Sequence, residues 1–149
     1  ASANGHVDVV QILLEDSRVD PSGYRNDAIR CASEKGRSEV VKLLLADPRV
    51  DPSDCDNDAI QCASEKGRSE VVKLLLADPR VDPSDCDNDA IQCASEKGRS
   101  EVVKLLLADP RVDPSDFNNL AIQRASEHGH ADVVQILLED FRVDPSAND

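Results

Sequence analysis

Carboxylates recur in this sequence at a spacing that could bind a calcium ion. The segment 54–65 carries acids at its first, third, fifth and twelfth positions, and the segment 85–96 repeats the arrangement. Calcium loops between two helices present oxygen ligands at those positions. Such loops need glycine at the sixth position, where Ala59 stands, and Pro79 and Pro83 leave no room for a helix entering the loop. The pattern therefore favours an acidic turn before a helix. No metal site is predicted, and a calorimetric calcium titration tests this interpretation.

Cysteines offer a second candidate chemistry, zinc binding or disulfide formation. They are Cys31, Cys55, Cys62, Cys86 and Cys93. The odd count, without a signal-peptide pattern, favours free thiols in a reducing compartment such as the cytoplasm. A zinc site is the alternative, but the Cys-x6-Cys pairs lack the short spacing of zinc knuckles and have no histidine nearby. The thiols at 31, 62 and 93 are expected to act as small hydrophobic residues. Those at 55 and 86 align with Tyr24 and Phe117 and are expected to form a half-buried apolar position.

No arrangement of nucleophile and base points to catalysis. His6 and His130 each follow a glycine, and His128 belongs to the last unit. We expect these histidines to form hydrogen bonds in loops. No serine or cysteine stands in a recognisable nucleophile motif, and no glycine-rich phosphate loop occurs. The sequence therefore predicts a protein that is not an enzyme and needs no cofactor.

The composition excludes two classes of partner. The 149 residues include 17 Lys and Arg against 30 Asp and Glu, a net charge of −13, and only 2% are aromatic. Nucleic-acid binding needs clustered positive charge, so we expect no nucleic-acid partner. No apolar run approaches the roughly 20 residues of a membrane helix, so no membrane span is expected either.

The dominant feature of the chain is a repeat of 31 residues. Residues 54–84 and 85–115 are the same string, and residues 23–53 differ from it only at four positions. Residues 116–146 form a more divergent unit, residues 1–22 are the back part of one further copy, and 147–149 are a tail. We interpret residues 1–149 as one repeat domain.

Each unit contains a first helical pattern that follows an acidic turn. In the unit 54–84, Asp58 is a candidate N-cap, and Gln61 is the candidate return partner of a capping box. Gly67 is suited to end this helix in a left-handed conformation. The narrow apolar face consists of Ala59, Ile60, Cys62 and Ala63.

A second helical pattern follows at once. Ser69 is placed to cap it, Lys73 is expected to point to solvent, and Pro79 should end it. The segment 80–84 is expected to be extended or turn-like, with Val81 as its one apolar anchor. The wide apolar face of this helix consists of Val71, Val72, Leu74, Leu75 and Leu76.

Helices of about eight residues are marginal alone in water. One pair of them cannot bury its own leucines, whereas stacked pairs can cover one another. The repeat therefore predicts an all-α solenoid with short fingers between its units.

These residues resemble the ankyrin repeat. The segment 67–76, Gly-Arg-Ser-Glu-Val-Val-Lys-Leu-Leu-Leu, is similar to the family's second-helix motif, and 58–64 occupies the place of its Thr-Pro-Leu-His motif. The resemblance recurs in every unit. Two departures are a period of 31 in place of the usual 33, and Asp-Ala in place of Thr-Pro. They imply a shortened finger whose aspartate caps as threonine would.

The resemblance implies binding of a protein partner through the fingers and the face of the first helices. Because two central units are identical, the sequence favours an engineered or consensus scaffold without an assigned target. A natural interaction module with one specific protein partner is the alternative. By resemblance, the contact positions are Tyr24, Arg25, Arg30, Cys55, Asp56, Gln61, Cys86, Asp87, Gln92, Phe117, Asn118 and Gln123.

The two ends differ from the middle. In the last unit Leu120 stands at the cap position, so Asn119 is the alternative cap, and Arg124 replaces the helix cysteine, as a solvent-facing end unit would allow. At the start, only the back part of a first helix is present. The second helix of that copy should therefore expose apolar side chains and favour weak self-association through this end. These side chains are Val9, Val10, Ile12, Leu13 and Leu14.

Overall fold

The computed structural model describes residues 1–144 and is helical throughout, with no strand in that range. This confirms the predicted all-α repeat solenoid. Residues 145–146 of the last predicted unit and the predicted tail 147–149 lie outside the described residues. The elements are η1 (Ser2–Asn4), α1 (Val7–Glu15), α2 (Gly23–Glu34), α3 (Ser38–Ala46), α4 (Asp54–Glu65), α5 (Ser69–Leu76), α6 (Asp85–Glu96), α7 (Ser100–Leu107), α8 (Asp116–Glu127) and α9 (Ala131–Leu138).

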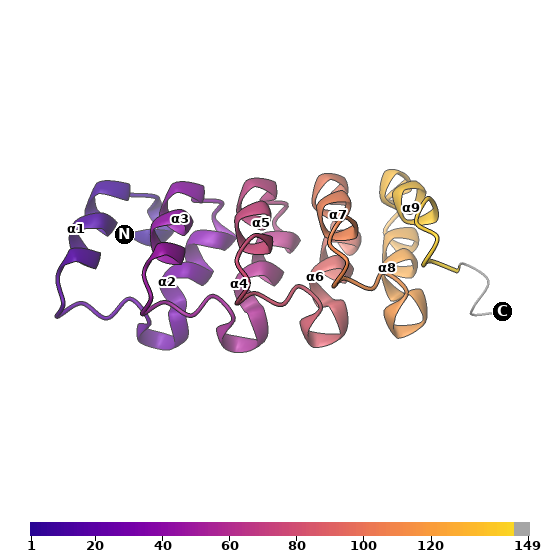
Figure 1. The fold of residues 1–149 in the computed structure, drawn as a ribbon. Helices are drawn as coiled ribbons and strands as arrows, with labels where there is room; N and C mark the ends of the chain where they lie inside the picture. The colour runs from indigo at the N-terminus through magenta and orange to yellow at the C-terminus, as the bar shows by residue number, and fades with distance from the viewer. Residues whose placement is uncertain (145–149) are drawn as a thin grey trace.

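The helices form a single row of pairs (Figure 1). First helices pack on first helices, in the order α2, α4, α6, α8, and second helices on second helices, in the order α1, α3, α5, α7, α9. In the row of first helices, α2 has no complete helix on its outer side, at the indigo end; within residues 1–144 the short η1 packs there. Each unit is therefore covered by its neighbours on two sides, as the shortness of the helices requires.

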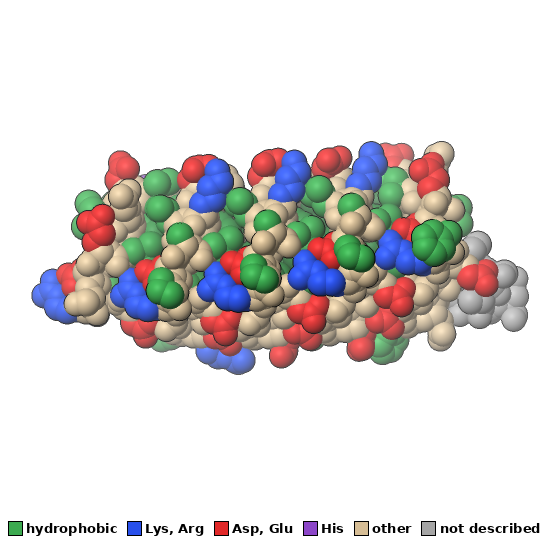
Figure 2. Space-filling model, in the orientation of Figure 1, with side chains coloured by type: hydrophobic (Ala, Val, Ile, Leu, Met, Phe, Trp, Pro, Cys, Tyr) green, Lys and Arg blue, Asp and Glu red, His purple; other side chains and the backbone are tan. Residues whose placement is uncertain are grey.

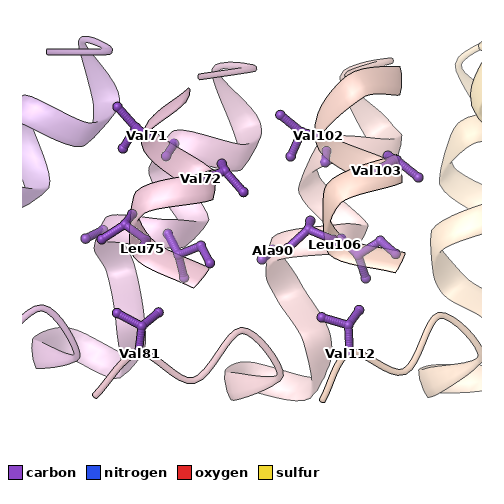
Figure 3. Packing of buried hydrophobic residues seen from close by; sticks show 14 of the residues in the cluster. Val71, Val72, Leu75, Val81, Ala90, Val102, Val103, Leu106 and Val112 are labelled. Atoms are coloured by element: carbon purple, nitrogen blue, oxygen red, sulfur yellow. The ribbon is translucent and has the colours of Figure 1, made fainter. Parts of the chain in front are cut away.

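The core runs along the whole row between the helix pairs. In α5, Val71, Val72 and Leu75 are each at most 1% exposed, and Val81 in the following segment is equally buried. Figure 3 shows Val72 directed toward the next unit and Val102 of that unit directed back toward it. The predicted apolar faces thus form a repeated contact between units, which we call a joint. In the joint shown, Val72 of α5 faces Val102 of α7.

The helix ends follow the predicted glycine and proline. Gly67 has φ +69°, and its neighbour Arg68 donates its amide to the Ala63 carbonyl at 2.8 Å, closing the first helix. A Cβ on Gly67 would also lie 2.8 Å from Cδ of Arg99, so glycine is required by both conformation and space. The helix α5 ends at Leu76, three residues before Pro79.

The predicted caps were wrong. Ser69 is the first residue of α5, and the N-cap residue Arg68 makes no side-chain cap bond. Gln61 donates its Nε2 to the Asp56 carbonyl at 2.6 Å, and the Asp58 carboxylate accepts from the Cys62 thiol, so these two residues do not form a capping box. At Asp58 the reason is the backbone before it, which forms a structured turn that the capping pattern does not anticipate. At Ser69 the helix already includes this residue, so its side chain stands one position too late to cap.

Arginines bridge each joint between units. Arg49 forms two bonds with the Asp47 carboxylate, at 2.9 and 2.6 Å. It also donates to the carbonyls of Val19 and Leu14 in the preceding copy, at 3.0 and 2.8 Å. The same arrangement is repeated by Arg80, Arg111 and Arg142. We call these four residues the joint arginines. Figure 2 shows basic side chains recurring along the row.

The two ends expose apolar surface. In α1, Val9 is 47% and Leu13 40% exposed, whereas the side chains one repeat later, Val40 and Leu44, are at most 1% exposed. Ile12 is also exposed, but Val10 is buried. The prediction of exposed apolar residues on this helix is therefore confirmed for most of them.

The last unit corrects two predictions. Arg124 is half-buried and extends back to Glu96 of the preceding unit, at 3.3 Å, and so is not turned out to solvent. Asn119 does not cap a helix, because its side chain binds the backbone of Asp144. In both cases the side chain contributes to packing between segments.

Candidate functional site

Each first helix begins with one turn of left-handed helix. In the unit 54–84, Cys55, Asp56 and Asn57 have φ of 57°, 58° and 60°, and the Asn57 amide donates to the Ser53 carbonyl at 2.9 Å. The other three full units have the same three-residue turn. Left-handed backbone costs a residue other than glycine about 1–2 kcal/mol, so the surrounding contacts must hold the turn in place. From here on, the word fingers means these four three-residue turns, at 24–26, 55–57, 86–88 and 117–119.

A buried asparagine holds each finger. Asn57 is 4% exposed; its Oδ1 accepts the Asp82 amide at 2.8 Å, and its Nδ2 donates to the Asp85 carboxylate of the next unit at 2.7 Å. Asn26 donates likewise to Asp54 and lowers the pKa of that carboxyl group. The asparagine therefore ties its finger both to the end of its own unit and to the next finger.

The first two residues of each finger lie at the surface of the molecule, with most of them exposed. Tyr24 is 97% and Phe117 59% exposed, and Cys86 is exposed too, so the prediction of a half-buried apolar position was wrong for these three residues and right for Cys55. The reason is that the left-handed turn directs these positions outward and buries only the third. The structure exposes Tyr24, Arg25, Asp56, Cys86, Asp87, Phe117 and Asn118 among the predicted contact residues, and leaves Cys55 half-buried.

The predicted glutamines brace the fingers. Gln61 and Gln123 are half-buried and Gln92 is buried, at 5% exposure. Each donates its Nε2 to the carbonyl of the second finger residue, at 2.6 to 2.7 Å. These glutamines therefore hold the finger backbone, and they lie directly behind the first two finger residues.

Basic side chains near this face are held by acids. Arg30 forms an ion pair with Asp27 and lies 3.7 Å from the Asp58 carboxylate of the next unit. The hydrogen bond to Asp27 is the main reason that the pKa of Arg30 is raised. Arg25, 3.9 Å from Asp54, is largely exposed. The first finger thus carries positive charge where the central fingers carry Asp56 and Asp87.

The acids of the calcium-like spacing are engaged separately. Asp54 accepts from Asn26 and from the Cys55 amide, at 2.9 and 2.7 Å, while Asp58 accepts from Cys62. Asp56 points outward on the finger. Across residues 1–144, no group of three or more histidine, cysteine or acidic side chains is placed to hold a metal ion.

The cysteines are all free thiols. Burial is the main cause that raises the pKa of Cys62 to about 12, and it raises the pKa of Cys93 to about 12 as well. A thiol with so high a pKa is a poor nucleophile and a poor metal ligand at neutral pH. These two cysteines, with Cys31, therefore belong to the packing of the first helices.

The histidines make hydrogen bonds at the end of the row. His130 Nε2 lies 2.8 Å from the Glu96 carbonyl, and since a carbonyl only accepts, this nitrogen carries the proton. Arg37, Arg68 and Arg99 donate to a carbonyl in the same way at the preceding joints. His128 Nδ1 lies 2.9 Å from the Arg124 carbonyl. The predicted role in loop hydrogen bonding is confirmed for His128 and His130.

Sequence reasoning missed the residues that hold the fingers, although they leave a signal. The finger asparagine and the joint arginine occur in all four full units, including the divergent last one. In contrast, the first two finger residues vary. An unvarying asparagine beside varying neighbours indicates a structural role for the asparagine and an exposed role for its neighbours. No helix in residues 1–144 combines the length and apolar character needed to cross a bilayer.

Comparison with known families agrees with this architecture. A family model described as ankyrin repeats (3 copies) matches residues 59–149, and one described as ankyrin repeats (many copies) matches residues 29–76. A search of curated proteins returned no match. Ankyrin repeats generally mediate protein–protein interaction and are generally not enzymes. Since the first match alone spans more than half of the sequence, and the helix pairs stack in a single row, the chain belongs to the ankyrin repeat family.

Proposed function

We propose that this chain is a non-catalytic scaffold that binds protein through the edge formed by its fingers. One observation carries the proposal: the first two full units differ only in and beside the finger, where Tyr24 and Arg25 are exposed. Units 23–53 and 54–84 differ only at four positions: Gly23 directly before the finger, Tyr24 and Arg25 in it, and Arg30 one helical turn behind it. Variable side chains on a fixed backbone are the usual form of a binding surface.

The fingers suit recognition because they are rigid before binding. The left-handed turn is tied by its asparagine, and in the last three units it is also braced by a glutamine, so little backbone entropy is lost when a partner docks. Tyr24 and Phe117 supply aromatic anchors near the two ends of the row, and aromatic residues are enriched among the energetic centres of interfaces. Asp56 and Asp87 place negative charge between them.

The identity of units 54–84 and 85–115 supports a further part of the proposal. Loops and exposed residues are copied along with the core, so one unit was amplified as a whole. We propose an engineered or consensus-like array whose central fingers were not adapted to one target. A natural module remains the second candidate, favoured by the differing fingers of the first and last units, which carry the two aromatic residues.

Affinity capture from cell lysate tests the proposal. The baits are the 149-residue chain, a double variant Tyr24→Ser and Phe117→Ser, and a control variant Lys73→Ala on the exposed side of α5, far from the fingers. Both aromatic residues are exposed, so the double variant should keep its fold, as circular dichroism can check.

Binding by the fingers requires that the captured protein be lost with the double variant and kept with the control. Equal capture by all three baits would refute binding through the fingers. A blank for every bait, together with high thermal stability, would favour the array without a natural target. Parallel captures with calcium and with a chelator show whether the acidic turns contribute.

A further inference from the structure

We propose that the first finger, at residues 24–26, opens and recloses locally in the free chain, whereas the other three fingers stay closed. The four positions at which unit 23–53 differs from unit 54–84 all lie in or beside this turn. In the described part of the chain, two hydrogen bonds that hold each later finger have no counterpart in the first. This opening is a property of the chain alone and does not depend on the proposed function.

The first missing bond lies at the entrance of the turn. In the last three units an aspartate precedes the finger, and its carboxylate accepts the amide of the first finger residue at 2.7 to 2.8 Å. Gly23 stands at this position in the first unit and has no side chain to accept the Tyr24 amide. Glycine also gives the open chain more backbone conformations than aspartate does, which favours opening.

The second missing bond comes from the helix behind the turn. In the last three units a glutamine donates to the carbonyl of the second finger residue at 2.6 to 2.7 Å. Arg30 stands at this position in the first unit, but its guanidinium is held by Asp27 and lies 3.7 Å from the Asp58 carboxylate. The side chain that donates to the Arg25 carbonyl is the Cys55 thiol, at 3.9 Å, and a thiol is a weak donor.

The second residue of the first finger is also less suited to its backbone. This position has φ between 57° and 60° in all four full units. Asp56, Asp87 and Asn118 occupy it in the last three, and aspartate and asparagine enter the left-handed region more readily than other residues with a side chain. Arg25 has no such advantage. The left-handed turn is therefore most costly in the finger that has the fewest hydrogen bonds.

The remaining contacts keep the opening local. Asn26 still accepts the Asp51 amide at 2.8 Å and donates to the Asp54 carboxylate at 2.9 Å. Behind the finger, Ile29 and Ala32 are at most 1% exposed. The closed turn is therefore the main conformation, and the open one is a local fluctuation of an intact unit. Where a partner docks on the fingers, as proposed above, the first finger is the contact whose backbone can adapt.

Hydrogen exchange at the finger asparagines tests the proposal, because their amides make the same backbone bond in every full unit. Each donates to the serine carbonyl four residues earlier, at 2.8 to 2.9 Å. After correction for intrinsic rates, the Asn26 amide should exchange roughly 10- to 100-fold faster than the Asn119 amide, since two hydrogen bonds are missing around it. Asn119 is the reference because units 54–84 and 85–115 are identical and their signals overlap.

Substitutions at the differing positions provide a comparison at one site. The double variant Gly23→Asp and Arg30→Gln supplies both missing groups and should slow exchange at Asn26 by roughly tenfold or more. Gln123→Ala removes the corresponding bond from the last finger and should speed exchange at Asn119. Lys42→Ala, which affects only an ion pair with Glu39 on α3, should change neither rate.

Three results would overturn the proposal. The first is equal exchange at Asn26 and Asn119 in the unmodified chain. The second is an unchanged rate at Asn26 in the double variant, which would show that the missing groups do not control the opening. The third is exchange at Asn26 that rises with added urea together with the amides inside α2 and α3, because that would indicate unfolding of the whole first full unit.

Discussion

Replacing a finger asparagine should destabilise the protein more than any other single polar substitution in a unit. Asn57→Ala removes the bond to the Asp85 carboxylate, at 2.7 Å, and the bond from the Asp82 amide, at 2.8 Å. A bond to a charged group contributes about 1.5–3 kcal/mol and a neutral bond about 1 kcal/mol. Alanine also adopts φ near +60° less readily than asparagine does. Since Asp82 is exposed and water can partly replace its bond, the expected loss is about 2–4 kcal/mol in the free energy of unfolding.

Urea unfolding followed by far-ultraviolet circular dichroism measures this loss, and two further variants separate its causes. Asn57→Gly loses both hydrogen bonds but accepts the left-handed backbone, so it should be about 1 kcal/mol less destabilising than Asn57→Ala. Asn119→Ala breaks bonds only to the backbone of Asp144, and it should cost about half as much as Asn57→Ala. A loss below about 1 kcal/mol for Asn57→Ala, or equal losses for the substitutions at 57 and 119, would refute the role given to this side chain.

Three further outcomes are expected. Ser64→Ala should raise the free energy of unfolding by about 1 kcal/mol, because the Ser64 hydroxyl is fully buried without a hydrogen-bond partner in the described structure. The hydroxyl of the exposed Ser126 donates to the Ile122 carbonyl at 2.8 Å. Ser126→Ala should therefore leave the free energy of unfolding nearly unchanged in the same urea titration. Hydrogen bonds from Arg80 are the main cause that lowers the pKa of Asp78. Asp78 therefore stabilises the folded state fully at pH values above the ordinary pKa of an aspartate, and this stability is lost as the pH falls through the lowered pKa. Unfolding titrations between neutral and acidic pH should therefore show less pH dependence for Asp78→Asn than for the unmodified chain. In thiol labelling at neutral pH, the exposed Cys86 should react first and the half-buried Cys62, whose pKa is raised, more slowly, and equal rates would contradict this difference in exposure.

The period of the sequence was enough to predict the solenoid. A 31-residue unit with two short apolar helices has too little core to fold alone, and its repetition supplies the missing cover. The positions of Gly67 and Pro79 also predicted where helices end, because both residues restrict the backbone locally. These conclusions needed only the chemistry of single residues and their spacing.

The finger could not be predicted from the same information. The residues Cys55, Asp56 and Asn57 have no local preference for three successive left-handed conformations, which cost free energy in isolation. The turn forms because Asn57 finds partners in two other segments, one of them in the next unit. The capping-box prediction at Asp58 and the half-burial prediction failed for this reason, since both assumed an ordinary turn before Asp58.

The sequence by itself therefore determined the architecture of this protein: helical pairs, their boundaries, their stacking and the apolar residues between them. Only the tertiary structure decided which side chains are exposed and which hold the backbone, because that division depends largely on contacts between segments 25 to 35 residues apart. The recurrence of the asparagine shows that it matters but not which atoms it binds, and only the structure shows that it is buried while most of the residues before it in the fingers are exposed.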